Sequence, residues 1–152
     1  VVVGTLVSGF LLLMEGCKEK TANDGVVIRA GSDPRLDAAA AEARKRWPEF
    51  VEEFNKREAN VAYAVKFSLP IKGGGVEHIW MQVTAIDGST IRGELGNDPV
   101  ADLGLKLGDA VTTTVDQLED WMVGRGEGNL KGLFSVPVLQ AIEAERKAKE
   151  GK

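Results

Sequence analysis

The spacing of apolar residues changes along the chain and separates a helical part from an extended part. Between residues 36 and 54 the apolar positions recur every three or four residues, as on one face of a helix: Leu36, Ala40, Ala43, Trp47, Phe50 and Phe54. Ser32 or Asp33 can cap this helix, and Pro34 suits its first turn. Pro48 interrupts the ladder of hydrogen bonds without changing the phase of the apolar positions. The pattern predicts a kinked helix or two abutting helices packed on one sheet.

From residue 61 onward apolar and polar residues alternate, which is the pattern of half-buried strands. Three strands are predicted in succession, over residues 61–69, 77–86 and 90–95, as in an antiparallel meander. In the second strand, alternate side chains share a face. One face then holds His78, Trp80, Gln82 and Thr84, and the other holds Glu77, Ile79, Met81 and Val83. We expect the second set to face the core and the first to form an aromatic and polar outer face.

The hairpin that joins the second and third strands needs one extra residue. A two-residue turn over residues 87–88 would point Ile91 away from the core that Met81 and Val83 face. A three-residue loop over residues 86–88, with Gly88 in the left-handed conformation of a bulge, satisfies both strands. We therefore predict this loop and a positive φ angle at Gly88.

The rest of the chain predicts one more strand and further helical structure. Residues 110–115 read as a strand, Asp116 can cap a short helical turn through Trp121, and residues 124–128 form a glycine-rich loop. Pro137 makes residues 133–139 an edge strand or a strand that ends in a helix start, and residues 140–149 read as a C-terminal helix. The predicted fold is α+β, with an N-terminal helix or kinked helix pair on a bent antiparallel sheet of four or five strands, which could close into a partial barrel.

The beginning of the chain is typical of an exported protein. Residues 1–14 are almost entirely apolar, but as a helix they would reach only about 21 Å, less than the ~30 Å hydrocarbon core of a bilayer. A cleaved export signal fits better than a transmembrane span. Gly16-Cys17 after this run resembles a bacterial lipoprotein processing site, in which the cysteine receives the lipid and becomes the new N-terminus.

Two departures keep other interpretations of this segment open. Glu15 stands where a small or uncharged residue is usual, and no Lys or Arg precedes the apolar run. Another exported or membrane-anchored form, or a buried N-terminal segment with an ordinary core cysteine at Cys17, are the alternatives. We expect a signal peptide over residues 1–16, a tether over 17–32 and one domain over 33–150. The expected location is the bacterial cell envelope, with a lipid at Cys17 as the attachment to the membrane.

Composition excludes several kinds of chemistry. The formal net charge of -4 provides no basic excess for neutralising phosphates, so we expect no binding to nucleic acid. One cysteine allows neither an internal disulfide nor a cysteine-based zinc site, and one histidine cannot form a two-histidine zinc motif. We expect no metal and no cofactor.

The outer face is the candidate binding site. His78, Trp80 and Gln82, beside Arg92 and Glu94 on the neighbouring strand, surround an aromatic residue with polar groups, as in many interaction hot spots. The partner would be an envelope protein, a peptide or a small ligand. In the alternative arrangement Trp80 lies beneath a helix and His78 forms a hydrogen bond within the domain.

An enzyme is the competing class. His78 would act as general base, with Glu77, Glu94 or Asp120 assisting at the floor of a concave pocket. Ser68, Ser89 and Ser135 are the available serine nucleophiles, and none stands in a nucleophile-elbow sequence. The interpretation that the sequence favours is a noncatalytic lipoprotein with a binding domain, and a hydrolase using His78 is the alternative.

An ordered series of short motifs runs through the domain. The motifs, in one-letter code, are AR at 43–44, WPEF at 47–50, YAVKF at 63–67, EHIWM at 77–81, GELGNDP at 93–99, LGDAV at 107–111 and EDWM at 119–122. This series resembles the YegJ-like bacterial family of domains of unknown function (number 2314), and the resemblance covers roughly residues 35 to 139. It implies a small α+β domain, often found in exported bacterial proteins, without established catalytic residues.

Overall fold

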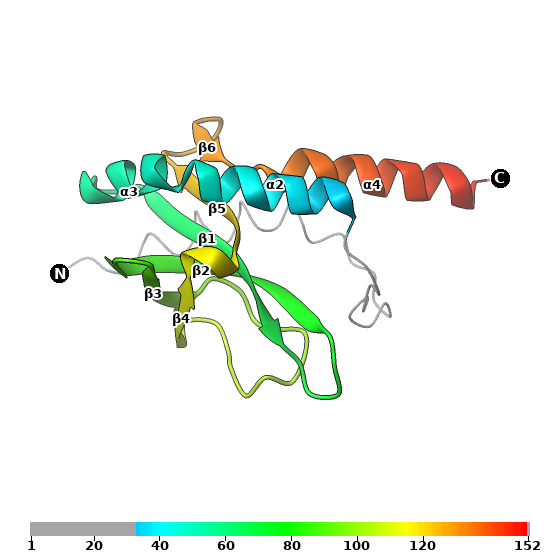
Figure 1. Ribbon diagram of the computed structural model, residues 1–152, viewed down its shortest axis with the longest axis horizontal. Coiled ribbons are helices and arrows are strands. Elements are labelled where there is room, and N and C mark those ends of the chain that lie inside the picture. The colour runs from blue at the N-terminus through cyan, green and yellow to red at the C-terminus, as the bar shows by residue number, and fades with distance from the viewer. Residues whose placement is uncertain (1–32, 152) are drawn as a thin grey trace.

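In the computed structural model, which describes residues 33–151, helices cover one side of a six-stranded antiparallel sheet (Figure 1). The helices are α2 (Pro34–Lys45), α3 (Trp47–Asn55) and α4 (Ser135–Glu150). The strands are β1 (Ala62–Pro70), β2 (Val76–Asp87), β3 (Thr90–Leu95), β4 (Ala110–Thr114), β5 (Leu118–Gly124) and β6 (Leu130–Gly132), and a short 3-10 turn, η1 (Val115–Gln117), precedes β5. The strand order is β4-β3-β2-β1-β5-β6.

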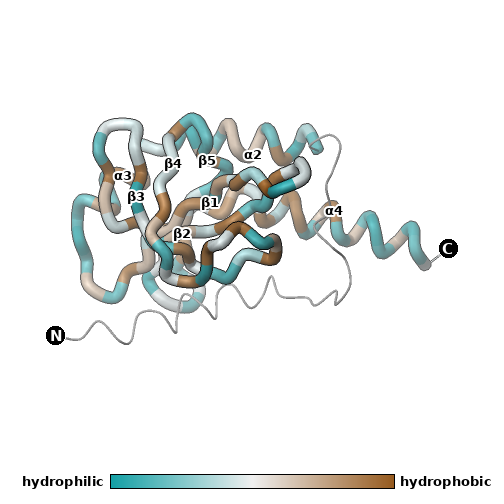
Figure 2. The backbone as a smooth tube through the Cα atoms, turned by 90° about the horizontal axis from the view of Figure 1, so that it is seen from below, coloured by the Kyte–Doolittle hydropathy of each residue, from teal (hydrophilic) through white to brown (hydrophobic). Residues whose placement is uncertain are grey.

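The predicted α+β class is confirmed, with six strands where four or five were expected. The sheet curls into a half-barrel, so that β2, β3 and β4 turn away from the level of β1 and β5 (Figure 1). Helices α2 and α4 run side by side above the sheet, and the last turns of α4 extend past the rest of the domain (Figures 1 and 2). Within residues 33–151 none of the helices combines the length and apolar character that a membrane crossing requires.

The predicted pair of abutting helices is confirmed. The Asp33 carboxylate accepts a hydrogen bond from the Arg35 amide at 2.9 Å and so caps α2. The helix ends at Lys45, and α3 begins at Trp47 with Pro48 in its first turn, where proline is tolerated. The break at Arg46 therefore lets one apolar stripe continue over two helices.

The main core lies between these helices and the concave face of the sheet. Phe50 of α3 stacks on Trp47 and meets the Trp121 ring edge-on, with centroids 4.8 and 5.7 Å apart. The Trp121 indole N–H donates to the Ala43 carbonyl at 2.9 Å, and the Arg44 guanidinium donates to the Leu118 carbonyl at 2.7 Å. These bonds fix α2 on β5. The predicted inward-facing residues of β2 are buried as well: Ile79, Met81 and Val83.

The β2–β3 hairpin contains the predicted extra residue at a different place. Asp87 pairs with Thr90, so the loop has two residues, Gly88 and Ser89, and the predicted three-residue loop is wrong. Gly88 has the predicted positive φ, 58°, and its place at the first loop position is that of a type II′ turn. The register shifts instead between Val83 and Ala85, which makes Thr84 the extra residue. This bulge lets the apolar side chains of both strands face the core, and it bends β2.

Gly93 explains why the bulge lies inside the strand pair. A Cβ atom on Gly93 would lie 2.1 Å from the carbonyl oxygen of Gln82, beside the shift in register. Only a residue without a side chain allows the two backbones to approach so closely.

The last third of the domain differs from its prediction in two places. Residues 118–121 belong to strand β5 and not to a helical turn. This strand lies between β1 and β6 and is buried on both faces, so its apolar residues do not alternate. Residues 133–139 form no strand, because the chain leaves β6 at Gly132 and enters α4 at Ser135. Pro137 lies in the first turn of α4, where its missing N–H costs nothing.

An ion-pair cluster around Glu53 fastens the β5–β6 hairpin to α3. The Glu53 side chain is 7% exposed and accepts hydrogen bonds from Lys131 at 2.6 Å, from Lys56 at 3.0 Å and from Arg125. The hydrogen bonds from Lys131, Arg125 and Lys56 lower the pKa of Glu53 from its ordinary 4.5 to about 2. The carboxylate is therefore charged at every pH above this value.

This cluster makes stability depend on acid pH. Because the folded pKa of Glu53 lies below its unfolded value, its contribution is complete above pH 4.5 and is lost as the pH falls toward 2. We expect Glu53→Gln to lower the free energy of unfolding by about 1 to 2 kcal/mol at pH 7, since its cations remain partly exposed. Urea denaturation at several pH values checks this. If the parent protein and the Glu53→Gln variant differed in free energy of unfolding by the same amount at pH 2 as at pH 7, the expectation would be contradicted.

Candidate functional site on the outer face

The face of the sheet that points away from the helices carries the predicted site residues. Lys66 of β1 pairs with Trp80 of β2, and Ser68 pairs with His78, so these four side chains are neighbours on the same face. The His78 side chain is 56% exposed. We call the group formed by Lys66, Ser68, His78, Trp80 and Glu119 the outer-face cluster.

Trp80 is partly buried and rests on apolar residues of the strands. It packs on a small cluster of its own, separate from the main core, whose other members are Ala62, Ala64, Met122 and Leu133. These residues belong to β1, β5 and the segment that leads into α4. Side chains of these strands and of the segment before α4 thus support one side of the indole, and among residues 33–151 no helix contributes to this cluster.

His78 forms its hydrogen bond with a residue 41 positions further along the chain. Its Nδ1 lies 2.7 Å from Oε2 of Glu119 on β5, on the opposite side of β1 from β2. The register of β1 and β5 shifts between Lys66 and Phe67, and Glu119 lies at this irregularity. The bulge brings the carboxylate to the outer face, beside His78.

The charge of Glu119 is stabilised in place. Burial raises the pKa of this carboxyl, but the hydrogen bond from His78, the charges of His78 and Lys66 and the nearby Ser68 hydroxyl together leave its pKa below the usual range. Glu119 is therefore an anion that is 24% exposed and that holds the imidazole in one orientation.

Glu77, the carboxylate expected to assist His78, lies on the other face of β2. It is 8% exposed, and its oxygens accept hydrogen bonds from the amides of Val100 and Ala101 at 2.6 and 2.8 Å. Its role is to hold the loop between β3 and β4. The structure therefore does not bring Glu77 and His78 together.

Asp120 likewise forms its hydrogen bonds with groups other than His78. It is completely buried and accepts hydrogen bonds from the Phe134 amide at 3.0 Å and from the Ser135 amide at 2.8 Å, which begin α4. Since Phe134 offers no side-chain cap of its own, Asp120 caps this helix from a neighbouring strand.

The remaining predicted residues line the same outer face nearer to β3. Gln82 pairs with Glu94, and the Arg92 guanidinium lies 3.9 Å from the Asp87 carboxylate. Arg92 and Glu94 are exposed, and Gln82 is partly buried. The predicted binding surface is thus one continuous face, and the sequence pattern did not indicate two of its members, Lys66 and Glu119.

The order of the groups in the cluster does not suit a serine nucleophile. A catalytic serine needs the imidazole as its direct partner, with the carboxylate behind the imidazole. Here Glu119 holds the His78 imidazole at 2.7 Å, and among the hydrogen bonds of residues 33–151 there is none between His78 and Ser68. Among residues 33–151, no three His, Cys, Asp or Glu side chains come together as a metal site. The arrangement can donate and accept hydrogen bonds around an aromatic ring.

Fold and face together define a small α+β domain with helices on one side of a curled sheet and the partly exposed group around His78 and Trp80 on the other. The chain belongs to the family described as "Uncharacterized protein conserved in bacteria (DUF2314)", which matches residues 33–150, and this confirms the resemblance. The uncharacterized protein YegJ of Escherichia coli (strain K12) is 29% identical over 121 residues, which are 78% of this chain and 77% of that protein. No solved structure matches.

Proposed function

We propose that the domain is a noncatalytic binding module that recognises a protein partner through the outer face around Trp80. The observation that carries the proposal is the setting of Trp80, which has apolar support on one side and the polar neighbours Lys66 and His78 around it. A supported aromatic ring with a polar rim is the composition of an interface hot spot. The Glu119 carboxylate fixes the orientation of the His78 side chain and so reduces the entropy cost of ordering it when a partner binds.

We also propose that the domain is carried by an envelope lipoprotein anchored through Cys17. This proposal is supported by the apolar run and the Gly16-Cys17 pair, both of which lie outside the described residues. Mass spectrometry of the mature N-terminus tests it, with a lipid-modified Cys17 as the expected result. Cys17→Ser should leave the protein in the soluble fraction. An unmodified cysteine in an uncleaved cytoplasmic chain would refute the proposal.

A hydrolase that uses His78 as general base is the second candidate. It is favoured by the 2.7 Å contact between His78 and Glu119, because a carboxylate on Nδ1 fixes the orientation of the imidazole. The exposure of the imidazole weighs against it, since general bases usually act in water-excluded sites. Turnover of a substrate that is abolished by His78→Ala would replace the binding proposal with this one.

Partner capture from envelope extracts tests the proposed function. Trp80→Ala should reduce recovery of the bound protein about tenfold, which corresponds to about 1.4 kcal/mol. Leu139→Ala is the control, because it removes an exposed apolar side chain from α4 and should leave recovery unchanged. Circular dichroism confirms that both variants are folded. Equal recovery by Trp80→Ala and Leu139→Ala would refute a site at Trp80.

A further inference from the structure

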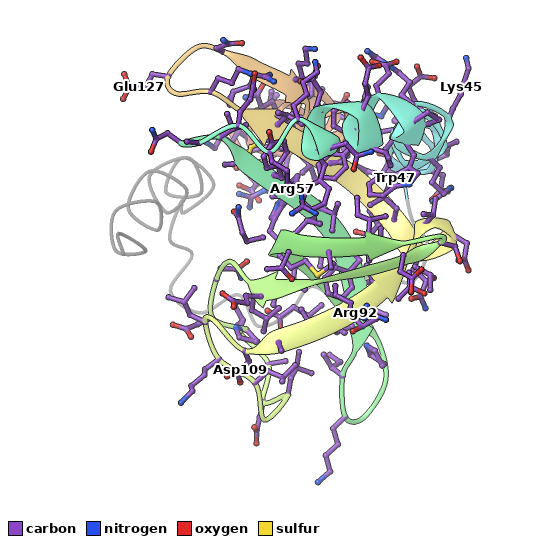
Figure 3. All side chains as sticks on the ribbon, turned by 90° about the vertical axis from the view of Figure 1, so that its left-hand side faces the viewer. Lys45, Trp47, Arg57, Arg92, Asp109 and Glu127 are labelled. Atoms are coloured by element: carbon purple, nitrogen blue, oxygen red, sulfur yellow. The ribbon has the colours of Figure 1, made fainter. Side chains whose placement is uncertain are left out.

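Strand β4 forms one edge of the sheet. Its pairing with β3 runs from Thr90 opposite Thr114 to Glu94 opposite Ala110, and no strand of the described residues pairs with its other side. Figure 3 shows β4 as the outermost strand, with Asp109 labelled where it begins. An unpaired edge of this kind can accept an additional strand.

The hydrogen bonds at the two ends of β4 show which backbone groups point outward. The Leu95 amide donates to the Asp109 carbonyl at 2.9 Å, and the Val115 amide donates to the Ser89 carbonyl at 3.0 Å. Because hydrogen-bonded and non-bonded pairs alternate in an antiparallel ladder, the intervening bonded residues of β4 are Val111 and Thr113. The N–H and C=O groups of Ala110, Thr112 and Thr114 therefore point away from β3.

The sequence of β4 leaves this edge open to pairing. The strand reads AVTTT in one-letter code and carries no proline and no charged side chain, which are the usual protections of an edge. Threonine and valine also favour the extended conformation. The opposite edge strand, β6, has only three residues and offers a much shorter edge.

Charge selects the kind of strand that fits. Asp109 precedes β4 and Asp116 follows it, and the sequence has no Lys or Arg between Leu107 and Gly124. On the neighbouring strand, the Arg92 guanidinium lies 3.9 Å from Asp87. A second copy of the chain, paired antiparallel about Thr112, would bring Asp109 of one molecule close to Asp116 of the other, which is unfavourable. A basic extended segment would meet these carboxylates instead.

We propose that β4 binds an extended peptide segment of a partner protein by β-strand addition, with Lys or Arg near the ends of that segment. Main-chain hydrogen bonds to Ala110, Thr112 and Thr114 supply the affinity, and Asp109 and Asp116 select the basic flanks. This site is separate from the outer-face cluster, because strand β3 lies between β4 and β2, the strand that carries His78 and Trp80.

A displayed library of random peptides of about twelve residues, selected on the full-length protein, tests the proposal. We expect enriched peptides with β-branched residues between basic flanks. One such peptide is then synthesised, and its affinity is measured by fluorescence anisotropy. Failure to enrich any peptide, or enrichment of acidic ones, would refute the proposal.

Substitution of Thr112 isolates the backbone contribution. Thr112→Pro removes an N–H that no β3 carbonyl accepts, so an edge strand tolerates it, and we expect affinity for the peptide to fall at least about tenfold. Thr112→Val keeps the N–H and should bind within about twofold of the parent. Peptides methylated on the backbone nitrogens of one edge should also lose affinity, and this test requires no altered protein.

Two further measurements separate this site from the alternatives. Trp80→Ala should leave peptide affinity unchanged, whereas loss of binding in that variant would place the peptide on the outer face and overturn the assignment to β4. Sedimentation of the full-length protein should show no dimer formed through β4, which is a dimer that the Thr112→Pro substitution would abolish. Such a dimer would make a second copy the occupant of this edge.

Discussion

Replacement of Trp121 with alanine should lower the free energy of unfolding by about 4 kcal/mol. The indole is completely buried, its ring meets Phe50 and Phe134 at centroid distances of 5.7 and 5.2 Å, and its N–H bonds to the Ala43 carbonyl. Truncation would leave a large cavity and an unpaired carbonyl between α2 and β5. Since small domains are stable by about 5 to 15 kcal/mol, this change removes much of the total. Urea denaturation at pH 7 measures it.

Trp80→Ala is the matched control for this effect. It removes the same side chain from the partly exposed outer face and should cost only about 1 to 2 kcal/mol. Equal losses for Trp80→Ala and Trp121→Ala would show that the outer apolar cluster is as important for stability as the main core, contrary to our expectation.

Asp120→Asn should cost about 3 kcal/mol. The carboxylate accepts hydrogen bonds from the amides of Trp121, Phe134 and Ser135 and from the Ser135 hydroxyl, at 2.8, 3.0, 2.8 and 2.5 Å. An amide keeps one oxygen but turns an NH2 group toward hydrogen-bond donors, so buried donors lose their partner. We expect denaturation at lower urea and faster hydrogen exchange at the beginning of α4.

Asp102→Asn provides the control, because it makes the same chemical change on an exposed residue of the β3–β4 loop. It should shift neither the midpoint of denaturation nor the exchange of α4. If Asp120→Asn behaves like Asp102→Asn, the proposed capping of α4 from β5 is wrong.

Local patterns in the sequence predict the helices and the meander because each element there has one buried face. The stripe through Trp47, Phe50 and Phe54 keeps its phase over Pro48, and the structure places all three aromatic residues in the core. Strand β5 violates this condition. With neighbours on both edges and side chains buried on both faces, residues 118–124 lack the alternation that marks a strand.

The sequence predicts the correct face of the sheet for His78 and Trp80. It predicts Glu77 as the carboxylate beside His78, where the structure has Glu119. His78 and Trp80 share the outer face because strand periodicity is local. The contact between His78 and Glu119 depends on β5 adding beside β1 and on a bulge at Lys66, and neither is visible in short-range spacing. The requirement that the apolar residues of both strands face the core predicted an extra residue in the β2–β3 hairpin. It did not place that residue at Thr84.

The order of the strands also determines when the domain can fold during synthesis. Helix α2 packs on β5, and β1 pairs with β5, so the elements made first have their partners in the last third of the domain. A nascent chain cannot complete its core until residue 124 has left the ribosome. The leading helices therefore remain without their packing partners until most of the domain has been synthesised.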